Sequence, residues 1–355
     1  MRILIDGLAI TGDSLAIVAE HLVAGWDKLP DGDELHIVVG PGNEAPFPDR
    51  VTVHEVPFGK RTQLSRIRAQ NVDLPRLARS LKADAVLGLL PTTTVAPLPC
   101  PRVIIAYDLR HELRPQQFSR MNRAQRKISY NLGWRQSDGI AVISDRTRND
   151  LLAARPWLAK RPLRLALLGA DHTDDWLRKD TEPYALAFGQ YFNKNVDLVI
   201  DAWALLRDCG PVMPLTVVGL GQAARTAAQA KVEELGLTDL VRVLPWLSIE
   251  EFRGTFASSS LIVFPSDFEG FGLPAAEAMR IGIPVVITPE PALLEITAGH
   301  ATVMDGWDAP ALADAVVASR ETTTDQIEAA REFAQRYTWK NAAADVRAVI
   351  VDAVG

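Results

Sequence analysis

Short runs rich in valine and isoleucine alternate with longer helical patterns along most of this 355-residue chain. Near-continuous apolarity in such short runs is typical of parallel strands that are covered on both faces. Alternation of strands with helices predicts a doubly wound α/β sheet. The strands expected in the first half are RILIDG, ELHIVVG, VTVHEV, ADAVLGL, RVIIAY and GIAVIS, which begin at residues 2, 34, 51, 83, 102 and 139.

The alternation starts again after a polar, acidic segment, GADHTDDWLRKDTEPY (169–184), which we interpret as a linker. Strands are expected at 185–189, 214–221, 241–246, 261–266 and 284–288, and helices at 194–207, 223–235, 249–258 and 274–281. The length of the chain suits about two domains. We therefore expect two Rossmann-like, doubly wound domains that face each other across a cleft, where the carboxyl ends of the strands hold ligands.

The composition excludes several classes of protein. With 48% apolar and 23% charged residues the chain is of globular type, and its formal charge of -6 argues against a general nucleic-acid binder. Cys100 and Cys209 lie far apart, which argues against a disulfide framework or a zinc site. The opening MRILIDGLAI is interpreted as a buried strand rather than a signal peptide, and no apolar run approaches the ~20 residues of a spanning helix. We expect a cytoplasmic protein.

One glycine-rich turn admits a different cofactor. Gly219, Gly221 and Ala224 form a GxGxxA pattern between a strand and a helix, as in dinucleotide-binding proteins. That fingerprint also requires an acidic residue at the end of the next strand, but this strand ends in Pro245 and Trp246. An NAD-dependent oxidoreductase is therefore the less favoured alternative, and a turn that admits a nucleotide or sugar fits better.

The stretch FPSDFEGFGLPAAEAM (264–279) contains the most informative pattern. It predicts a strand, a glycine-rich loop and a helix that starts at Pro274, where the missing N–H costs nothing. Free N–H groups and the helix dipole form an anion site at such a helix start. The residues expected to approach the anion are Gly270, Phe271, Gly272 and Leu273.

Two glutamates flank this turn at a separation of eight positions. Glu277 falls about one turn inside the helix, where a carboxylate can accept hydrogen bonds from a ribose diol. Glu269 lies on the other side of the turn and would face whatever is attached beyond the phosphate. Phosphate, ribose and a further hydroxylated group together make a nucleotide-sugar. The simpler alternative is that Glu277 complements the helix dipole and that Glu269 is a solvated charge.

The chain resembles the family 4 glycosyltransferases, which have the two-domain GT-B fold. Residues 264–286 resemble the E-x7-E region of that family. Other segments resemble family segments in the same order, namely AVISDRTRNDLL (141–152), LLGADH (167–172), AFGQYFNKNVDLVIDAWALL (187–206) and YTWKNAA (337–343).

The resemblance implies transfer of a hexose or deoxyhexose from a nucleotide-sugar to a hydroxyl of a glycan, a glycolipid or a small molecule. Retention of the anomeric configuration and independence of a metal ion or other cofactor are expected. Carried over to this chain, Glu277 holds the donor ribose, Glu269 the donor sugar and Lys194 the diphosphate. A fixed cation with helix N–H groups would stabilise the charge on the leaving nucleotide. Gly189, Gly219 and Trp246 are further donor-binding candidates.

Two departures from the family pattern affect this prediction. Asn193 and Gln190 stand where an arginine is common, so the phosphate site is one charge poorer unless Arg225 or Arg280 reaches it. Tyr107 stands in place of a histidine and is followed by Asp108; both are assigned to the catalytic site, with His111 as an acceptor-binding candidate. These changes keep open a catalytically silent relative that only binds nucleotide-sugars.

The resemblance implies an acceptor domain over 1–172, a donor domain over 173–338 and a helix over 339–355 that packs back on the first domain. Gly12 is expected near the donor phosphates and Asp13 near an acceptor hydroxyl. The first domain also contains a basic segment with the interspersed apolar residues Phe118, Met121, Ile128 and Trp134. It suits contact with an anionic membrane; the simpler alternative is a solvated helix. Its basic residues are Arg102, Arg110, Arg114, Arg120, Arg123, Arg126, Lys127 and Arg135.

Overall fold

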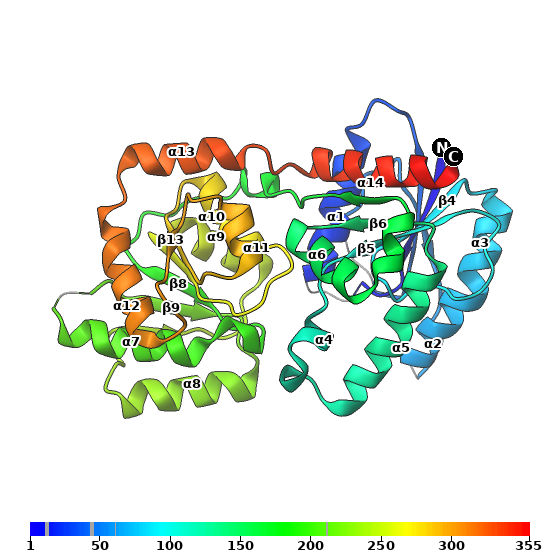
Figure 1. The fold of residues 1–355 in the computed structure, drawn as a ribbon. Helices are drawn as coiled ribbons and strands as arrows, with labels where there is room; N and C mark the ends of the chain where they lie inside the picture. Colours follow the sequence, from blue (N-terminus) through cyan, green and yellow to red (C-terminus); the bar gives the residue numbers. More distant parts are fainter. Residues whose placement is uncertain (11–13, 43–45, 61, 211) are drawn as a thin grey trace. The chain divides into compact units, whose positions relative to one another are not determined.

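The computed structural model describes residues 1–10, 14–42, 46–60, 62–210 and 212–355. Its contacts divide the chain into two compact units. Unit 1 comprises Met1–Gly169 together with Tyr337–Gly355, and unit 2 comprises Ala170–Arg336. Each unit is an α/β domain built around its own sheet; in Figure 1, unit 1 contains the blue start and the red end of the chain, and unit 2 contains the green-to-orange part between them.

Unit 1 contains a seven-stranded sheet in the order β3-β2-β1-β4-β5-β6-β7, in which all paired strands are parallel. The order reverses between β1 and β4, as in doubly wound folds. The strands are β1 (Arg2–Gly7), β2 (Glu34–Val39), β3 (Thr52–Glu55), β4 (Ala85–Gly88), β5 (Arg102–Ala106), β6 (Gly139–Val142) and β7 (Leu163–Leu165). Its α-helices are α1 (Ser14–Asp27), α2 (Thr62–Arg68), α3 (Leu74–Leu81), α4 (Arg110–Leu113), α5 (Arg120–Gln136), α6 (Asp145–Ala154) and α14 (Trp339–Val354).

Unit 2 contains a six-stranded parallel sheet in the order β10-β9-β8-β11-β12-β13, which reverses between β8 and β11. The strands are β8 (Ala185–Phe188), β9 (Leu215–Val218), β10 (Val241–Val243), β11 (Leu261–Phe264), β12 (Val285–Ile287) and β13 (Thr302–Val303). The α-helices are α7 (Val196–Asp208), α8 (Gln222–Glu234), α9 (Ile249–Ser258), α10 (Leu273–Ile281), α11 (Pro291–Thr297), α12 (Ala309–Ala318) and α13 (Thr324–Ala334).

The predicted two-domain α/β architecture is confirmed. The central strands are buried along their whole length, which explains their unbroken apolar sequences. Helix α10 begins at Leu273, one residue before the predicted start, and Pro274 occupies its second position. In the part of the chain that the structure describes, no helix is both long and apolar enough to cross a bilayer.

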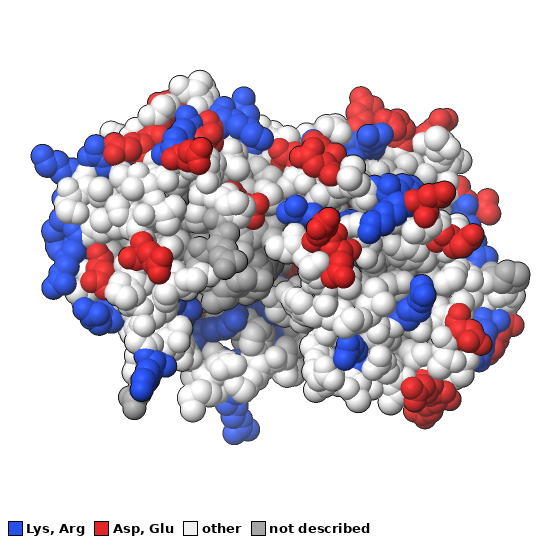
Figure 2. Space-filling model, turned by 180° about the vertical axis from the view of Figure 1, so that it is seen from behind, with Lys and Arg blue, Asp and Glu red and all other residues white. Residues whose placement is uncertain are grey.

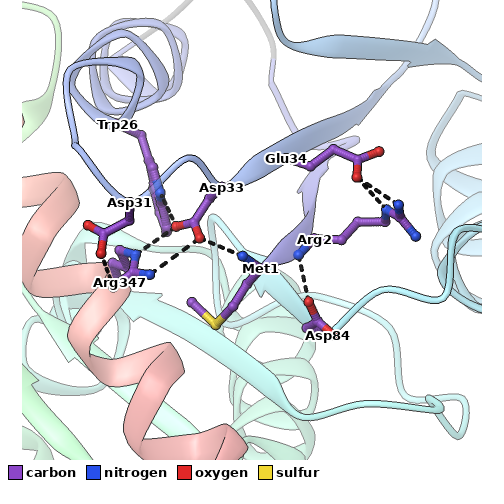
Figure 3. A network of polar contacts seen from close by, with 8 residues as sticks. All are labelled: Met1, Arg2, Trp26, Asp31, Asp33, Glu34, Asp84 and Arg347. Atoms are coloured by element: carbon purple, nitrogen blue, oxygen red, sulfur yellow. Dashed lines mark hydrogen bonds and ion pairs between the residues drawn. The ribbon is translucent and has the colours of Figure 1, made fainter.

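The last helix, α14, belongs to unit 1 and packs along α1 and the strands β5, β6 and β7. Gly25 of α1 allows this close approach, because a Cβ there would lie 2.3 Å from the Trp339 carbonyl oxygen. Figure 3 shows the polar contacts of Arg347 in the middle of α14. Arg347 Nε donates to Asp33 Oδ2 at 2.7 Å, and Asp33 also accepts from the Trp26 indole and the Met1 amino group. Three donor groups thus meet around one carboxylate whose side chain is 1% exposed.

Candidate active site

The loops after β8 and β11 leave the sheet of unit 2 at the point where the strand order reverses. β8 and β11 are neighbours, with Leu186 paired to Ile262, while β9 and β12 flank them on opposite sides. Connections that leave in opposite directions open a crevice at the carboxyl ends of the two central strands. The sequence-predicted residues Gly189 and Lys194 follow β8, and Glu269 follows β11.

The structure brings two of the predicted catalytic residues together. Lys194 Nζ lies 2.5 Å from Glu269 Oε1, and the two side chains are 11% and 14% exposed. The ammonium group also lies 4.2 Å from the centre of the Phe264 ring, a cation–π distance. A partly buried cation is therefore held in place beside a carboxylate, and both remain accessible to a ligand.

Asn193 joins the two loops. Its side chain is buried, and Nδ2 is within hydrogen-bond distance of Ser266 Oγ at 2.8 Å, the Phe268 carbonyl at 2.8 Å and Glu269 Oε1 at 3.1 Å. In return, the Asp267 amide donates to the Asn193 carbonyl at 3.0 Å. Asn193 thus fixes the loop that contains Glu269, although it stands where an arginine is common in the family that the sequence resembles.

The turn before α10 has a conformation that only glycine adopts readily. Gly272 has a φ of 98° and forms the N-cap of the helix, so Leu273 is the first helical residue. A Cβ at Gly272 would lie 2.4 Å from Leu293 Cδ2. The predicted anion-binding residues Gly270, Phe271, Gly272 and Leu273 therefore lead directly into the helix start, where the dipole favours negative charge.

Glu277 lies inside α10 and is only 5% exposed. Its Oε1 is 2.9 Å from Nε2 of His172, which lies in a short 3-10 turn (Asp171–Thr173) at the start of unit 2. The histidine fixes the carboxylate that we assign to the donor ribose. Sequence reasoning missed this partner because 105 residues separate the pair.

The other predicted donor-binding residues of unit 2 lie at strand ends. Gly219 follows β9 with a φ of 80°, and Gly189 follows β8, where a Cβ would lie 2.5 Å from the Leu220 side chain. Trp246 follows β10 and is 64% exposed. Both glycines therefore have a backbone or packing reason for their identity, and the indole offers a surface for stacking.

The two arginines considered as extra phosphate ligands differ in their surroundings. Arg280 is 6% exposed and forms a two-pronged ion pair with Asp174, at 2.6 and 2.7 Å. This ion pair fixes the start of unit 2 to α10. The guanidinium group of Arg280 is thus bound to Asp174 rather than directed to a phosphate. Arg225 lies in the first turn of α8 and contacts Gln222 Oε1 at 3.2 Å.

Three of the remaining predicted residues, Tyr107, Asp108 and His111, belong to unit 1 and follow β5. The Tyr107 carbonyl accepts a hydrogen bond from Thr147 Oγ1 at 2.9 Å. The Tyr107 hydroxyl has no hydrogen-bond partner among the described residues, and burial raises its pKa. Asp108 Oδ1 accepts from the Arg110 amide at 2.8 Å, at the start of α4. His111 is 1% exposed. Gly12 and Asp13 lie outside the described residues.

A metal site would require several ligating side chains that lie close together. Across residues 1–10, 14–42, 46–60, 62–210 and 212–355, no group of three or more His, Cys, Asp or Glu side chains is arranged to hold a metal ion. The charge at the switch point of unit 2 comes from Lys194 and from the start of α10.

Comparison with protein families identifies this second half. Residues 170–333 match the family model described as glycosyl transferases group 1. This part of the chain is thus similar to the group 1 glycosyl transferases. The match begins one residue before the turn that contains His172, and it includes Lys194, Glu269 and Glu277. All three thus lie within the matched residues.

Curated relatives match the chain over limited regions. The D-inositol 3-phosphate glycosyltransferase of Corynebacterium urealyticum is 31% identical over 163 residues, which cover 42% of this chain and 38% of the relative. The O-antigen chain mannosyltransferase B of Escherichia coli is 33% identical over 104 residues, which cover 28% and 27%. The chain thus spans less than half the length of these relatives.

Solved structures match over nearly the whole chain. HepE of Anabaena in complex with UDP-glucose has a TM-score of 0.73 at 16% identity and covers 99% of both chains. WaaG, a glycosyltransferase involved in lipopolysaccharide biosynthesis, has a TM-score of 0.66 at 17% identity and covers 100% of this chain and 98% of its own. At this level of identity the likeness concerns the fold, which is GT-B, as predicted.

Proposed function

We propose that this chain is a glycosyltransferase that moves a hexose or deoxyhexose from a nucleotide-sugar to an acceptor hydroxyl. The observation that carries the proposal is the group of Lys194, Glu269 and the start of α10 at the switch point of a group 1 domain. A nucleotide-sugar presents a pyrophosphate, a ribose and a second sugar. This part of the domain presents a fixed cation, a helix start and two carboxylates to match them.

The proposed mechanism follows from where charge develops. When the bond between sugar and diphosphate breaks, negative charge accumulates on the departing nucleotide. Lys194 and the amide groups at the start of α10 lie where they can stabilise that charge without a metal ion. A diphosphate would compete with Glu269 for Lys194, which frees the carboxylate to bind the donor sugar. Glu277, held by His172, would accept the ribose hydroxyls. We propose that transfer proceeds with retention.

The acceptor is proposed to be a hydroxyl of a glycan, a glycolipid or a small molecule. Unit 1 would bind it through His111, which follows β5, and through Asp13, which follows β1 in the sequence. Tyr107 and Asp108 are proposed for the catalytic site, and Gly12 is proposed to lie near the donor phosphates. The Tyr107 hydroxyl and the His111 imidazole, whose polar atoms are buried, are groups that can form hydrogen bonds with a sugar. Relatives named for D-inositol 3-phosphate and for O-antigen chains support an acceptor with many hydroxyl groups.

Peripheral contact with the inner face of a membrane is a further part of the proposal. Helix α5 exposes Met121 by 78% and Ile128 by 63%, and it also carries the exposed Arg123 and Lys127. Such a surface suits anionic lipid headgroups. Two members of the basic segment are not part of it, because Arg102 is 5% exposed and Trp134 is fully buried. Co-sedimentation with anionic vesicles tests this contact, and Met121→Asp should reduce it.

A thermal-shift panel of UDP-, GDP-, ADP- and dTDP-sugars, followed by transfer assays, tests the proposed activity. A ligand that binds the folded state alone raises the apparent melting temperature. We expect one nucleotide-sugar to do so and Glu277→Ala to weaken its binding about tenfold or more, the loss typical of a charge-assisted hydrogen bond. Glu269→Ala should mainly lower turnover.

Two outcomes would replace the proposal. Tight donor binding without hydrolysis or transfer would identify a catalytically silent relative, for which Asn193 and Tyr107 are the motivating departures. Stabilisation by NADH alone would favour the oxidoreductase alternative. That alternative has little support from local geometry, because β10 is followed by Leu244 and Pro245 rather than by an acidic residue.

A further inference from the structure

A pocket of about 420 Å³ lies in unit 1 between α4 and α5. His111, Glu112, Arg120, Arg123, Ala124 and Lys127 line it. The volume is within the range of small-molecule sites. In Figure 2, Lys and Arg are the charged side chains drawn at the lower left, the end of unit 1 that holds α2 and α5. Three of the residues that line the pocket, Arg120, Arg123 and Lys127, are cationic.

The cationic wall of the pocket comes from one face of α5. Arg120, Arg123 and Lys127 follow a spacing of three and four residues, which places their side chains in one row along a helix. All three are exposed, and none forms an ion pair with a described residue. Three neighbouring positive charges without acidic partners repel one another, so an anion between them would be stabilised.

His111 contributes a buried polar side chain to the same pocket. It is 1% exposed, and neither ring nitrogen has a hydrogen-bond partner among the described residues. Nε2 lies 3.4 Å from Glu112 Oε1, without the geometry of a hydrogen bond, and the Tyr130 ring packs edge-on at 4.8 Å. Buried polar groups are nearly always satisfied, so a ligand or solvent in the pocket is expected to bind this imidazole.

Glu112 adds an acceptor for hydroxyl groups. Its Oε1 is 2.5 Å from Arg155, a buried arginine that also donates to Asn131 Oδ1 at 2.8 and 2.9 Å. The contact with His111 and the ion pair with Arg155 lower the pKa of Glu112 to about 2. This carboxylate stays ionised at neutral pH but is neutralised by Arg155, so it can accept hydrogen bonds without cancelling the cationic wall.

We propose that this pocket binds a phosphorylated polyol or sugar, with its phosphoryl group between Arg120, Arg123 and Lys127 and its hydroxyls towards Glu112 and His111. Multiple cations suit a phosphate dianion, and a fixed carboxylate suits the neighbouring hydroxyl groups. The part of the inference that makes this ligand the sugar acceptor rests on the proposed function. The same phosphoryl chemistry is offered by a soluble sugar phosphate and by a lipid headgroup.

Calorimetric titration of the full chain tests the pocket. The probes are a hexose 6-phosphate, inorganic phosphate and the unphosphorylated hexose, and vesicles of phosphatidylcholine with and without phosphatidic acid serve as competitors. We expect the hexose 6-phosphate to bind, the free hexose not to bind, and Arg123→Gln and Lys127→Gln each to weaken binding about tenfold, as typical for a lost charge-assisted hydrogen bond.

Arg126→Gln is the matched control. Arg126 lies on the same helix, but its guanidinium group stacks on Phe118 at 5.2 Å and is not part of the pocket wall. This variant changes the same charge and should keep the affinity within about twofold, because solvent and salt screen charges outside the site. Absence of binding, or an equal loss in all three variants, would overturn the proposal. Competition by phosphatidic acid vesicles alone would support it and assign the phosphoryl group to a lipid.

The acceptor role is tested separately with the same variants. If the nucleotide-sugar binds and transfer to a phosphorylated acceptor drops in Arg123→Gln but not in Arg126→Gln, the pocket is an acceptor site. If transfer is unchanged in Arg123→Gln, this role is wrong while the proposed function stands. If no nucleotide-sugar binds, the proposed function fails, and the pattern of hexose 6-phosphate affinities still decides whether the pocket binds phosphoryl groups.

Discussion

Both sheets carry a polar network at the carboxyl end of a central strand, and the two networks differ in exposure and charge. In unit 2 the network contains an ammonium and a carboxylate, Lys194 and Glu269, and each side chain is more than a tenth exposed. In unit 1 the corresponding group is Asp6 at the end of β1, which is 3% exposed. Asp6 accepts hydrogen bonds from Thr93 Oγ1 at 2.7 Å and Gln70 Nε2 at 3.0 Å.

The difference separates a network that can meet a ligand from one that fixes backbone. Burial raises the pKa of Asp6 although Thr93, Leu8 and Gln70 donate to it, and a closed site of this kind has no room for a substrate. In unit 2 the same topological position offers a cation, a carboxylate and a helix start together. The two networks share their position at a switch point, and accessible charge distinguishes the one that we propose as the donor site.

Lys194→Ala should have the largest effect and tests the accessible network. Loss of a group that stabilises developing charge typically lowers kcat by about 10²–10³-fold. Because Lys194 is not in the core, the melting temperature should change little. Lys231→Ala is the control, since Lys231 is a lysine of α8 that pairs with Asp201 at 2.7 Å. Steady-state kinetics with the identified donor would contradict the assignment if Lys194→Ala kept the parental kcat.

Asp6→Ala should lower the stability of the fold rather than impair catalysis. Removal of the shared acceptor leaves the buried Thr93 hydroxyl without its acceptor and Gln70 Nε2 with the Thr92 carbonyl alone, which should cost about 2 kcal/mol of unfolding free energy. Donor affinity should stay unchanged. Asp84→Ala, at the exposed amino end of β4, is the control for loss of a carboxylate near the same sheet. Denaturant unfolding measures the stability; a loss of donor affinity in Asp6→Ala would remove the distinction between the two networks.

The sequence predicts much of the fold and of the donor site because their signals are local. Near-continuous apolar runs predict the central strands, and a glycine with the following proline predicts the start of α10 to within one residue. Glu269 and Glu277 lie in one stretch of the chain, so their proximity to the helix start follows from helix geometry alone.

The features of the structure that the sequence does not reveal depend on contacts between residues far apart in the chain. The pairs His172–Glu277 and Asp174–Arg280 are separated by more than 100 residues, and no local pattern indicates them. The short strand β7 has only three residues, of which Arg164 is exposed, so it lacks the apolar run that marks the central strands. In unit 1, only the packing of α4 on α5 creates the pocket beside His111.

Arg347→Ala should destabilise unit 1 and leave unit 2 intact. The substitution removes a cation from the buried Asp33 carboxylate in the network of Figure 3. Breaking a buried ion pair is expected to cost about 2 kcal/mol here, below the usual range, because Arg347 itself is 21% exposed. Limited proteolysis should cleave unit 1 earlier than in the parent, and Arg336→Ala, an exposed arginine at the end of unit 2, is the control. Equal loss of both units would contradict this assignment.

The same ion pair predicts a dependence of stability on pH. Burial acts to raise the pKa of Asp33, but hydrogen bonds from Arg347, the amino terminus and Trp26 outweigh it and hold this pKa below its usual value. The stabilisation is therefore present above the unfolded pKa of about 4 and is lost as the pH falls towards the folded value. Urea unfolding between pH 6 and about 3 should show a smaller acid-dependent loss in Arg347→Ala than in the parent.

Gly272→Ala should cause the smallest of the three predicted losses of stability, about 1–2 kcal/mol, because its φ of 98° is unfavourable for alanine and the flexible Leu293 side chain can move aside. Gly221→Ala is the control, because Gly221 has a φ of -65° and no atom within 4 Å of an added Cβ. Thermal unfolding should separate the two variants. Equal stability would show that the turn before α10 tolerates side chains, and would weaken the case for a constrained anion site.

A crystal structure of the chain with its nucleotide-sugar tests the central claim most directly. The account predicts the pyrophosphate within hydrogen-bond distance of Lys194 Nζ and of the amide groups at the start of α10, with the ribose hydroxyls on Glu277. A ligand bound elsewhere, with the Lys194–Glu269 contact and the start of α10 unchanged and unoccupied, would contradict it.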